Sequence, residues 1–130
     1  EGRGENADIE RIHNLKTGAL ISFSARAGAM IAAADESKVA VINAFADQLG
    51  LLFQITDDLL DMSQTSEVLG KTAGKDAATS KATYPSKYGF AAAQQMAKEV
   101  HERAIASLDP LGDRAFLLRD IADHILDRTS

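Results

Sequence analysis

Apolar residues recur at helical spacing along most of the chain. Over residues 7–34 they fall at intervals of three and four positions, which predicts a long first helix. A second apolar stripe over residues 38–62 predicts a second long helix, with Ser37 as its N-cap. Residues 1–5 and 63–80 are polar and show no sustained period, so they are predicted to form a lead and a loop.

Two further helices are predicted beyond this loop. Pro85 stands at a position typical of a first helical turn and predicts a new helical start. Residues 90–108 then show the period of a third long helix, which should end before the Pro-Leu-Gly sequence at 110–112. Asp113 is expected to cap a last helix that ends near residue 127.

Composition agrees with a helical protein. The chain has 130 residues, of which 45% are hydrophobic and 5% aromatic, with no Trp. Ala and Leu dominate, and runs of β-branched residues are missing, which favours helices over strands. Cys is absent, so disulfides and thiolate metal sites are excluded. We therefore expect one all-α domain over residues 1–130, built as a helical bundle.

Charge and hydropathy limit the possible partners. The net charge of −5 argues against nucleic acid, which requires a basic surface. The apolar stretch at 18–34 has about the length of a membrane span, but Arg26 interrupts it and small residues dominate it. A buried, closely packed helix is the better interpretation. With no signal peptide at the start of the chain, a cytoplasmic location is expected.

Three aspartates, Asp57, Asp58 and Asp61, follow a strongly apolar segment within about one helical turn. Carboxylates this close raise one another's pKa, and an apolar wall adds desolvation, so a cation between them would relieve the cost. Mg²⁺ suits the site, because it uses one or two carboxylates together with water and phosphate oxygens. A solvated helix end is the alternative, although acidic residues there oppose the helix dipole.

Lysines near these aspartates suggest a phosphate ligand. Lys71 and Lys81 lie in the predicted loop, where a lysine is usually only solvated. Lys16 lies on a helix whose pattern otherwise predicts burial, where a lysine usually either snorkels to solvent or has a function. A core-facing lysine needs a polar or anionic neighbourhood. We therefore expect the three aspartates to converge near Lys16.

Residues 12–21 contain the sequence Lys-Thr-Gly-Ala-Leu, and residues 54–61 contain the three aspartates. These two segments resemble the Lys-Thr-Gly-Ala-Leu helix and the second aspartate-rich motif of the trans-prenyl diphosphate synthases. The pattern continues at the expected spacing from Gly70-Lys71 to Thr83-Tyr84-Pro85. The resemblance covers essentially the whole chain and is strongest to the short-chain bacterial farnesyl diphosphate synthases.

The resemblance implies an isoprenoid-synthase fold and a Mg²⁺-dependent condensation. An allylic diphosphate ionises, isopentenyl diphosphate attacks the cation, and farnesyl or geranylgeranyl diphosphate results. By the same resemblance, Asp57 and Asp61 bind Mg²⁺ with support from Asp58. The diphosphate oxygens pair with three lysines, Lys16, Lys71 and Lys81. Thr17 and Gln54 line the allylic cation.

One departure from the family pattern concerns length. Members of the family are more than twice as long and carry a first aspartate-rich motif that this sequence lacks. The chain therefore corresponds to the C-terminal half of such a synthase, and we expect it to be inactive alone. It would need the N-terminal half or a partner chain, and the complete enzyme is expected to be a homodimer. A catalytically incomplete or regulatory helical subunit is the alternative.

Overall fold

The computed structural model describes residues 2–69 and 83–129, and the side chains within 15–64 and 83–129. In these ranges the chain is helical and contains no strand, so the predicted all-α class is confirmed. The elements are α1 (Gly2–Ile31), α2 (Glu36–Leu69), α3 (Tyr84–Tyr88), α4 (Phe90–Ser107), the 3₁₀ helix η1 (Asp109–Ala115) and α5 (Phe116–Asp127).

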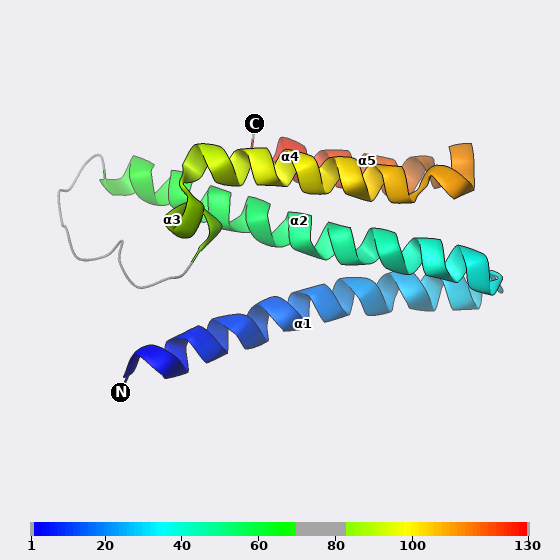
Figure 1. Ribbon diagram of the computed structural model, residues 1–130, viewed down its shortest axis with the longest axis horizontal. Helices are drawn as coiled ribbons and strands as arrows, with labels where there is room; N and C mark the ends of the chain where they lie inside the picture. The colour runs from blue at the N-terminus through cyan, green and yellow to red at the C-terminus, as the bar shows by residue number, and fades with distance from the viewer. Residues whose placement is uncertain (1, 70–82, 130) are drawn as a thin grey trace.

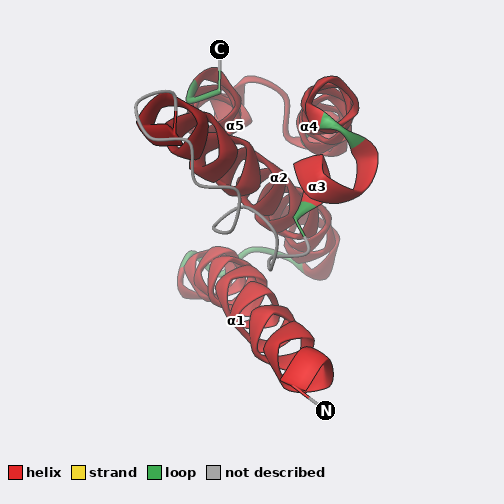
Figure 2. Cartoon of the chain, turned by 90° about the vertical axis from the view of Figure 1, so that its left-hand side faces the viewer, coloured by secondary structure: helices red, strands yellow, loops and turns green. Residues whose placement is uncertain are grey.

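Helix α2 is the centre of the fold. Helices α4 and α5 lie along one side of it, and α1 lies along the other (Figure 1). Seen from the end of the bundle, α1 stands apart from the group formed by α3, α4 and α5 (Figure 2). Within the described residues α1 packs against α2 alone. The helix that carries Lys16 therefore has a single neighbour in the described part of the chain.

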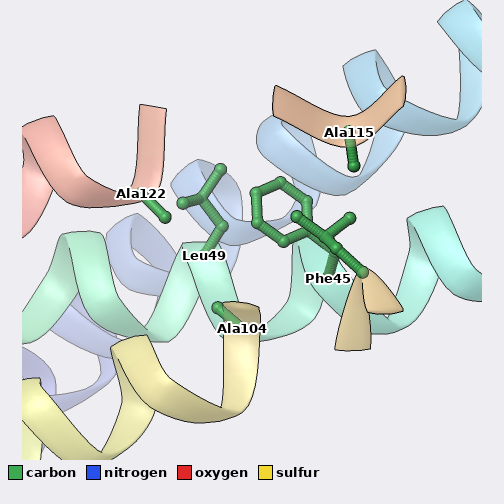
Figure 3. Close-up of a cluster of buried hydrophobic side chains, with 6 residues drawn as sticks. Phe45, Leu49, Ala104, Ala115 and Ala122 are labelled. Carbon is green, nitrogen blue, oxygen red and sulfur yellow. The ribbon is translucent and has the colours of Figure 1, made fainter. Parts of the chain in front are cut away.

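The core consists of two apolar clusters along α2. Phe45 and Leu49 pack against alanines of α4, η1 and α5, namely Ala104, Ala115 and Ala122 (Figure 3). Further along α2, the second cluster joins Leu52, Ile55 and Leu59 to Ala93, Ala97 and Val100 of α4. Alanines on α4 and α5 let these helices approach the large side chains of α2. Ile21 of α1 also packs against the first cluster, so that cluster reaches the α1 side of α2.

The turn between the first two helices differs from the expectation in one detail. Helix α1 ends at Ile31, and Ala33 adopts a positive φ of 53° in the turn. Asp35, rather than Ser37, caps α2: its Oδ1 accepts a hydrogen bond from the Lys38 backbone N–H at 3.0 Å. The Ser37 hydroxyl donates a hydrogen bond to the same Oδ1 atom of Asp35 at 2.6 Å, so Ser37 supports the capping residue and is not the cap itself. The Lys38 ammonium and this hydroxyl hold the pKa of Asp35 well below its usual value.

Helix boundaries also depart from prediction at both ends of the long helices. Residues 2–5 already belong to α1, so the expected lead is wrong there. Helix α2 continues through Leu69, so the predicted loop is wrong over residues 63–69. The Ser63 hydroxyl donates back to the carbonyl oxygen of Leu60 at 2.8 Å, which lets a polar residue continue the helix. The rest of the predicted loop, residues 70–82, lies outside the described residues.

The C-terminal helices largely match their predicted ranges. Thr83 caps α3 and Pro85 stands in its first turn, as expected. Asp113 does not cap the last helix: it lies inside η1, and α5 begins only at Phe116 with no side-chain cap. The reason is the turn at Gly112, whose φ of 56° delays the start of regular helix.

The exposure of α1 corrects the expectation of a buried helix. Its large apolar side chains include Leu15, Leu20, Phe23, Met30 and Ile31, each more than half exposed. Small residues on α1 allow close packing, and among the described elements α2 is the one that packs against them. In α2, the stretch over residues 36–64 is long enough to cross a membrane and contains an 18-residue window with a mean hydropathy of 1.4. The core helix of a globular bundle meets the same criteria, and α2 supplies both buried clusters.

Candidate functional site

Helices α1 and α2 come closest at two glycines. A methyl group on Gly50 would lie 3.3 Å from the Cα atom of Gly18, tighter than ordinary van der Waals contact. One turn away, the Ser22 hydroxyl donates to Asp47 Oδ1 at 3.1 Å. The pairs Gly18–Gly50 and Ser22–Asp47 run in opposite directions along the two helices. The helices are therefore antiparallel here.

This crossing fixes where two predicted site residues lie. Thr17 precedes Gly18 on α1, and Gln54 follows Gly50 by one turn on α2. Because the helices are antiparallel, both residues lie on the same side of the closest approach. Thr17 and Gln54 are both half-buried. Their hydroxyl and amide groups are the first polar side chains beyond the glycine contact in that direction.

Lys16 lies beside this pair, but it is not the buried lysine that the sequence suggested. Its side chain is exposed and forms no hydrogen bond or ion pair with the side chains that the structure describes. The expected convergence of the aspartates on Lys16 is therefore not observed among these residues. The physical reason is the single neighbour of α1, which leaves much of the helix circumference uncovered.

A polar stripe continues along α2 from the crossing. Gly50, Gln54, Asp57 and Asp61 recur at intervals of four, three and four residues, which places them on one face of the helix. Gly50 shows that this face looks toward α1. Asp57 and Asp61 therefore lie one and two turns beyond Gln54 on the α1-facing side, where the ribbons of α1 and α2 diverge (Figure 1).

A cation from the C-terminal helix approaches Asp57. Arg128 Nη2 lies 3.9 Å from Asp57 Oδ1, and the guanidinium sits 5.4 Å from the ring centroid of Phe53. Both charged side chains are partly exposed, so the ion pair adds little stability. Sequence spacing indicated no basic partner for the aspartates, because Arg128 is brought close only by the packing of α5 against α2.

Asp58 differs from its two neighbours. Its Oδ2 accepts a hydrogen bond from the Tyr84 backbone N–H at 3.0 Å, and its Oδ1 accepts one from Gln54 Nε2 at 3.3 Å. Burial raises the pKa of Asp58, and the charges of Asp57 and Asp61 act in the same direction. The two donated hydrogen bonds oppose this shift in pKa.

The described residues contain no group of three or more acidic or histidine side chains placed to hold a metal. Asp58, one of the three predicted ligands, is engaged by Tyr84 and Gln54. Asp57 and Asp61 still fit Mg²⁺ by donor chemistry, since this ion needs only one or two carboxylates beside water and phosphate oxygens. Lys71 and Lys81 lie outside the described residues.

Comparison with known proteins identifies the family. The polyprenyl synthetase family model matches residues 4–111. The chain belongs to this family. It is 40% identical over 123 residues to a dimethylallyltranstransferase of Fischerella ambigua (strain UTEX 1903), covering 95% of this chain and 36% of that protein. It is also 40% identical over 132 residues to a geranylgeranyl diphosphate synthase of Cyanophora paradoxa, covering 100% of this chain and 44% of that protein.

A solved structure from the polyprenyl synthetase family has the same fold. The crystal structure of a candidate farnesyl-diphosphate synthase from Marinomonas sp. MED121 superposes with a TM-score of 0.71 at 35% identity. The match covers 92% of this chain and 39% of that one. The predicted family and the isoprenoid-synthase type of helical fold are confirmed. The chain spans 36% to 44% of the length of these relatives.

Sequence reasoning missed the contribution of α3 to this candidate site. In the sequence, Tyr84 was noted only as part of the Thr83-Tyr84-Pro85 segment. In the structure, its backbone N–H donates a hydrogen bond to Asp58. Burial raises the pKa of the Tyr84 phenol, and the neighbouring charge of Asp58 raises this pKa further. A local signal was present: Thr83 and Ser86 form a capping box that fixes where α3 begins. The contact across 26 positions has no such signal in the sequence.

Proposed function

We propose that this chain supplies one magnesium–diphosphate half-site of a trans-prenyl diphosphate synthase. The reaction condenses an allylic diphosphate with isopentenyl diphosphate and gives farnesyl or geranylgeranyl diphosphate. One observation carries the proposal: Asp57 and Asp61 lie one turn apart on the α1-facing stripe of α2, in a chain of the polyprenyl synthetase family. The names of the relatives support the reaction class.

In this proposal each group at the site has a distinct task. Bound Mg²⁺ would neutralise charge on the leaving diphosphate and so favour ionisation of the allylic C–O bond. The Asp57 and Asp61 carboxylates would hold the ion. Lys16, Lys71 and Lys81 would donate hydrogen bonds to the diphosphate oxygens.

Thr17 and Gln54 would act on the hydrocarbon part of the substrate. Both lie beside the glycine crossing, where the backbones of α1 and α2 approach closely and hold these side chains in place. The Thr17 hydroxyl oxygen and the Gln54 amide oxygen can face developing positive charge, and fixed dipoles of this kind stabilise a cationic transition state. The new carbon–carbon bond forms to isopentenyl diphosphate, and the proton it loses passes to the released diphosphate.

The exposed apolar side chains of α1 favour a second candidate role. Leu20, Phe23 and Met30 are each more than 60% exposed, which is typical of a surface that another polypeptide covers. The chain could then be a non-catalytic or regulatory helical subunit of a synthase. A homodimeric assembly of the complete enzyme and a cytoplasmic location stay predictions.

A reconstitution assay tests both roles. The purified chain is incubated with Mg²⁺, geranyl diphosphate and isopentenyl diphosphate, alone or with the N-terminal part of a full-length relative supplied as a separate polypeptide. We expect no product from the chain alone and product from the mixture. Asp57→Ala should lower turnover in the mixture by at least about 100-fold. Asp113→Ala, which removes an exposed aspartate of η1, is the matched control.

The outcomes separate the two roles. Product from the chain alone that is lost in Asp57→Ala would contradict the half-site interpretation, because this chain would then be sufficient. Activity of the mixture that requires the chain but survives Asp57→Ala would support the regulatory subunit instead. Near-normal turnover in that variant would rule out Asp57 as a metal ligand.

A further inference from the structure

One side chain of α2 holds the start of another helix. Asp58 is half-buried, and its Oδ2 accepts the Tyr84 backbone N–H at 3.0 Å across a separation of 26 residues. Tyr84 is the first residue of α3, and the N–H groups of a first helical turn have no acceptor within their own helix. The carboxylate of Asp58 therefore supplies an acceptor that α3 itself lacks.

The capping box of α3 does not use the Tyr84 backbone N–H, which donates to Asp58 instead. Thr83 Oγ1 accepts the Ser86 backbone N–H at 3.2 Å, and Ser86 Oγ accepts the Thr83 backbone N–H at 2.8 Å. Both bonds lie within the turn and fix its conformation, but neither reaches Tyr84. The Asp58 contact ties this turn to α2 by a side-chain hydrogen bond.

The second oxygen of Asp58 is also engaged. Gln54 Nε2 lies 3.3 Å from Asp58 Oδ1. A carboxylate can only accept hydrogen bonds, so the Gln54 amide must turn its NH₂ group toward Asp58. The Gln54 carbonyl oxygen consequently points away from Asp58. In the proposed reaction this oxygen is the part of Gln54 that can face a cation.

We propose that Asp58 is a positioning residue and not a magnesium ligand: it anchors the start of α3 to α2 and sets the direction of the Gln54 amide. This inference rests on the proposed function, because it leaves Mg²⁺ to Asp57 and Asp61. Two engaged oxygens on Asp58 contrast with the single loose ion pair of Asp57, whose partner is 3.9 Å away.

Amide hydrogen exchange tests the anchor in the full 130-residue chain. The exchange rate of the Tyr84 amide is compared in the wild type, Asp58→Ala, Asp58→Asn and the control Asp57→Asn. Asp58→Ala should raise the rate about tenfold or more, because it removes a charge-assisted hydrogen bond. Asp58→Asn should stay within about threefold of the wild type, because the asparagine carbonyl oxygen can accept the same N–H.

Binding of inorganic diphosphate in the presence of Mg²⁺ tests the second half of the inference. Titration calorimetry on the same four proteins should show at least about tenfold weaker binding in Asp57→Asn and less than about threefold in Asp58→Asn. An equal loss in both variants would make Asp58 a ligand and overturn the inference, as would an unchanged Tyr84 exchange rate in Asp58→Ala. If the wild type binds no magnesium diphosphate, the proposed function fails, and the exchange rates alone decide whether Asp58 anchors α3.

Discussion

The glycine crossing between α1 and α2 allows a matched test of the site geometry. Gly18 and Gly50 lie in the interiors of two helices, where Ala is more favourable than Gly by about 1 kcal/mol. A methyl group on Gly18 meets no atom within 4 Å, whereas a methyl group on Gly50 lies 3.3 Å from Gly18 Cα. The two substitutions therefore gain the same helix propensity and differ in packing.

The expected magnitudes follow from this difference. Gly18→Ala should raise the free energy of unfolding by about 1 kcal/mol, since nothing opposes the gain in helix propensity. Gly50→Ala must push α1 away by a few tenths of an ångström, and overpacking of this kind costs about 1–3 kcal/mol. Gly50→Ala should therefore be less stable than Gly18→Ala by at least about 1 kcal/mol.

Urea unfolding followed by circular dichroism measures both free energies. The unfolding midpoint should rise for Gly18→Ala and should stay unchanged or fall for Gly50→Ala, with the same m-value in each protein. Equal stabilisation by the two substitutions would refute the reasoning. The backbones of α1 and α2 would then not approach as closely as described, and the placement of Thr17 beside Gln54 would lose its basis.

Two further predictions concern the rest of the fold. Hydrogen bonds from Lys38, first, and from Ser37 lower the pKa of Asp35. The charged form of Asp35 therefore stabilises the fold above about pH 4, and this stabilisation is lost as the pH falls. Asp35→Asn should therefore be less stable than the wild type at neutral pH, and the gap in urea midpoint should narrow on acidification; a constant gap from pH 7 to 2 would contradict it. Phe45 is 1% exposed and Phe23 is 71% exposed, so Phe45→Ala should lower the unfolding free energy by about 3–5 kcal/mol and Phe23→Ala by less than about 0.5 kcal/mol. Similar losses would show that α1 is covered in solution.

The elements that sequence reasoning predicted well are those with local causes. The start of α3 follows from a cap, a proline and a serine within four residues, so the pattern at 83–86 indicates it directly. The N-cap of α2 was predicted at Ser37, two positions after the observed cap at Asp35. Asp35 is the cap because Lys38 contacts the Asp35 carboxylate twice, through the Lys38 backbone N–H and through the Lys38 ammonium group.

Contacts between distant residues could not be predicted in the same way. The ion pair of Asp57 with Arg128 and the hydrogen bond of Asp58 to Tyr84 both depend on how helices pack onto α2. Spacing within one helix allows three carboxylates to share a face, but it cannot show that one of them is engaged elsewhere. No sequence pattern therefore indicated that Asp58 accepts hydrogen bonds from Tyr84 and Gln54, and metal binding by the three aspartates stays a prediction.

Lys16 shows the same limit for burial. The many apolar residues of α1 indicate that several of its faces can be covered, but composition does not say what covers them. Here α2 covers one face, and residues such as Leu20 and Phe23 stay exposed together with Lys16. A lysine on an apolar helix is therefore buried only where a second neighbour exists, and no second neighbour is found among the described residues.

The close approach of Gly18 and Gly50 determines which residues of α2 face α1 at the candidate site. Gly50 faces Gly18, and from that point the helical period alone carries Gln54, Asp57 and Asp61 along the same face of α2. Because these residues share one rigid helix, their spacing cannot change without breaking α2, whose inner face is held by two buried clusters. The distance from this stripe to α1 is less constrained, since α2 is the only described element that packs against α1. The relation of Thr17 and Lys16 to the aspartates is therefore the part of the site that a covering polypeptide on α1 would control.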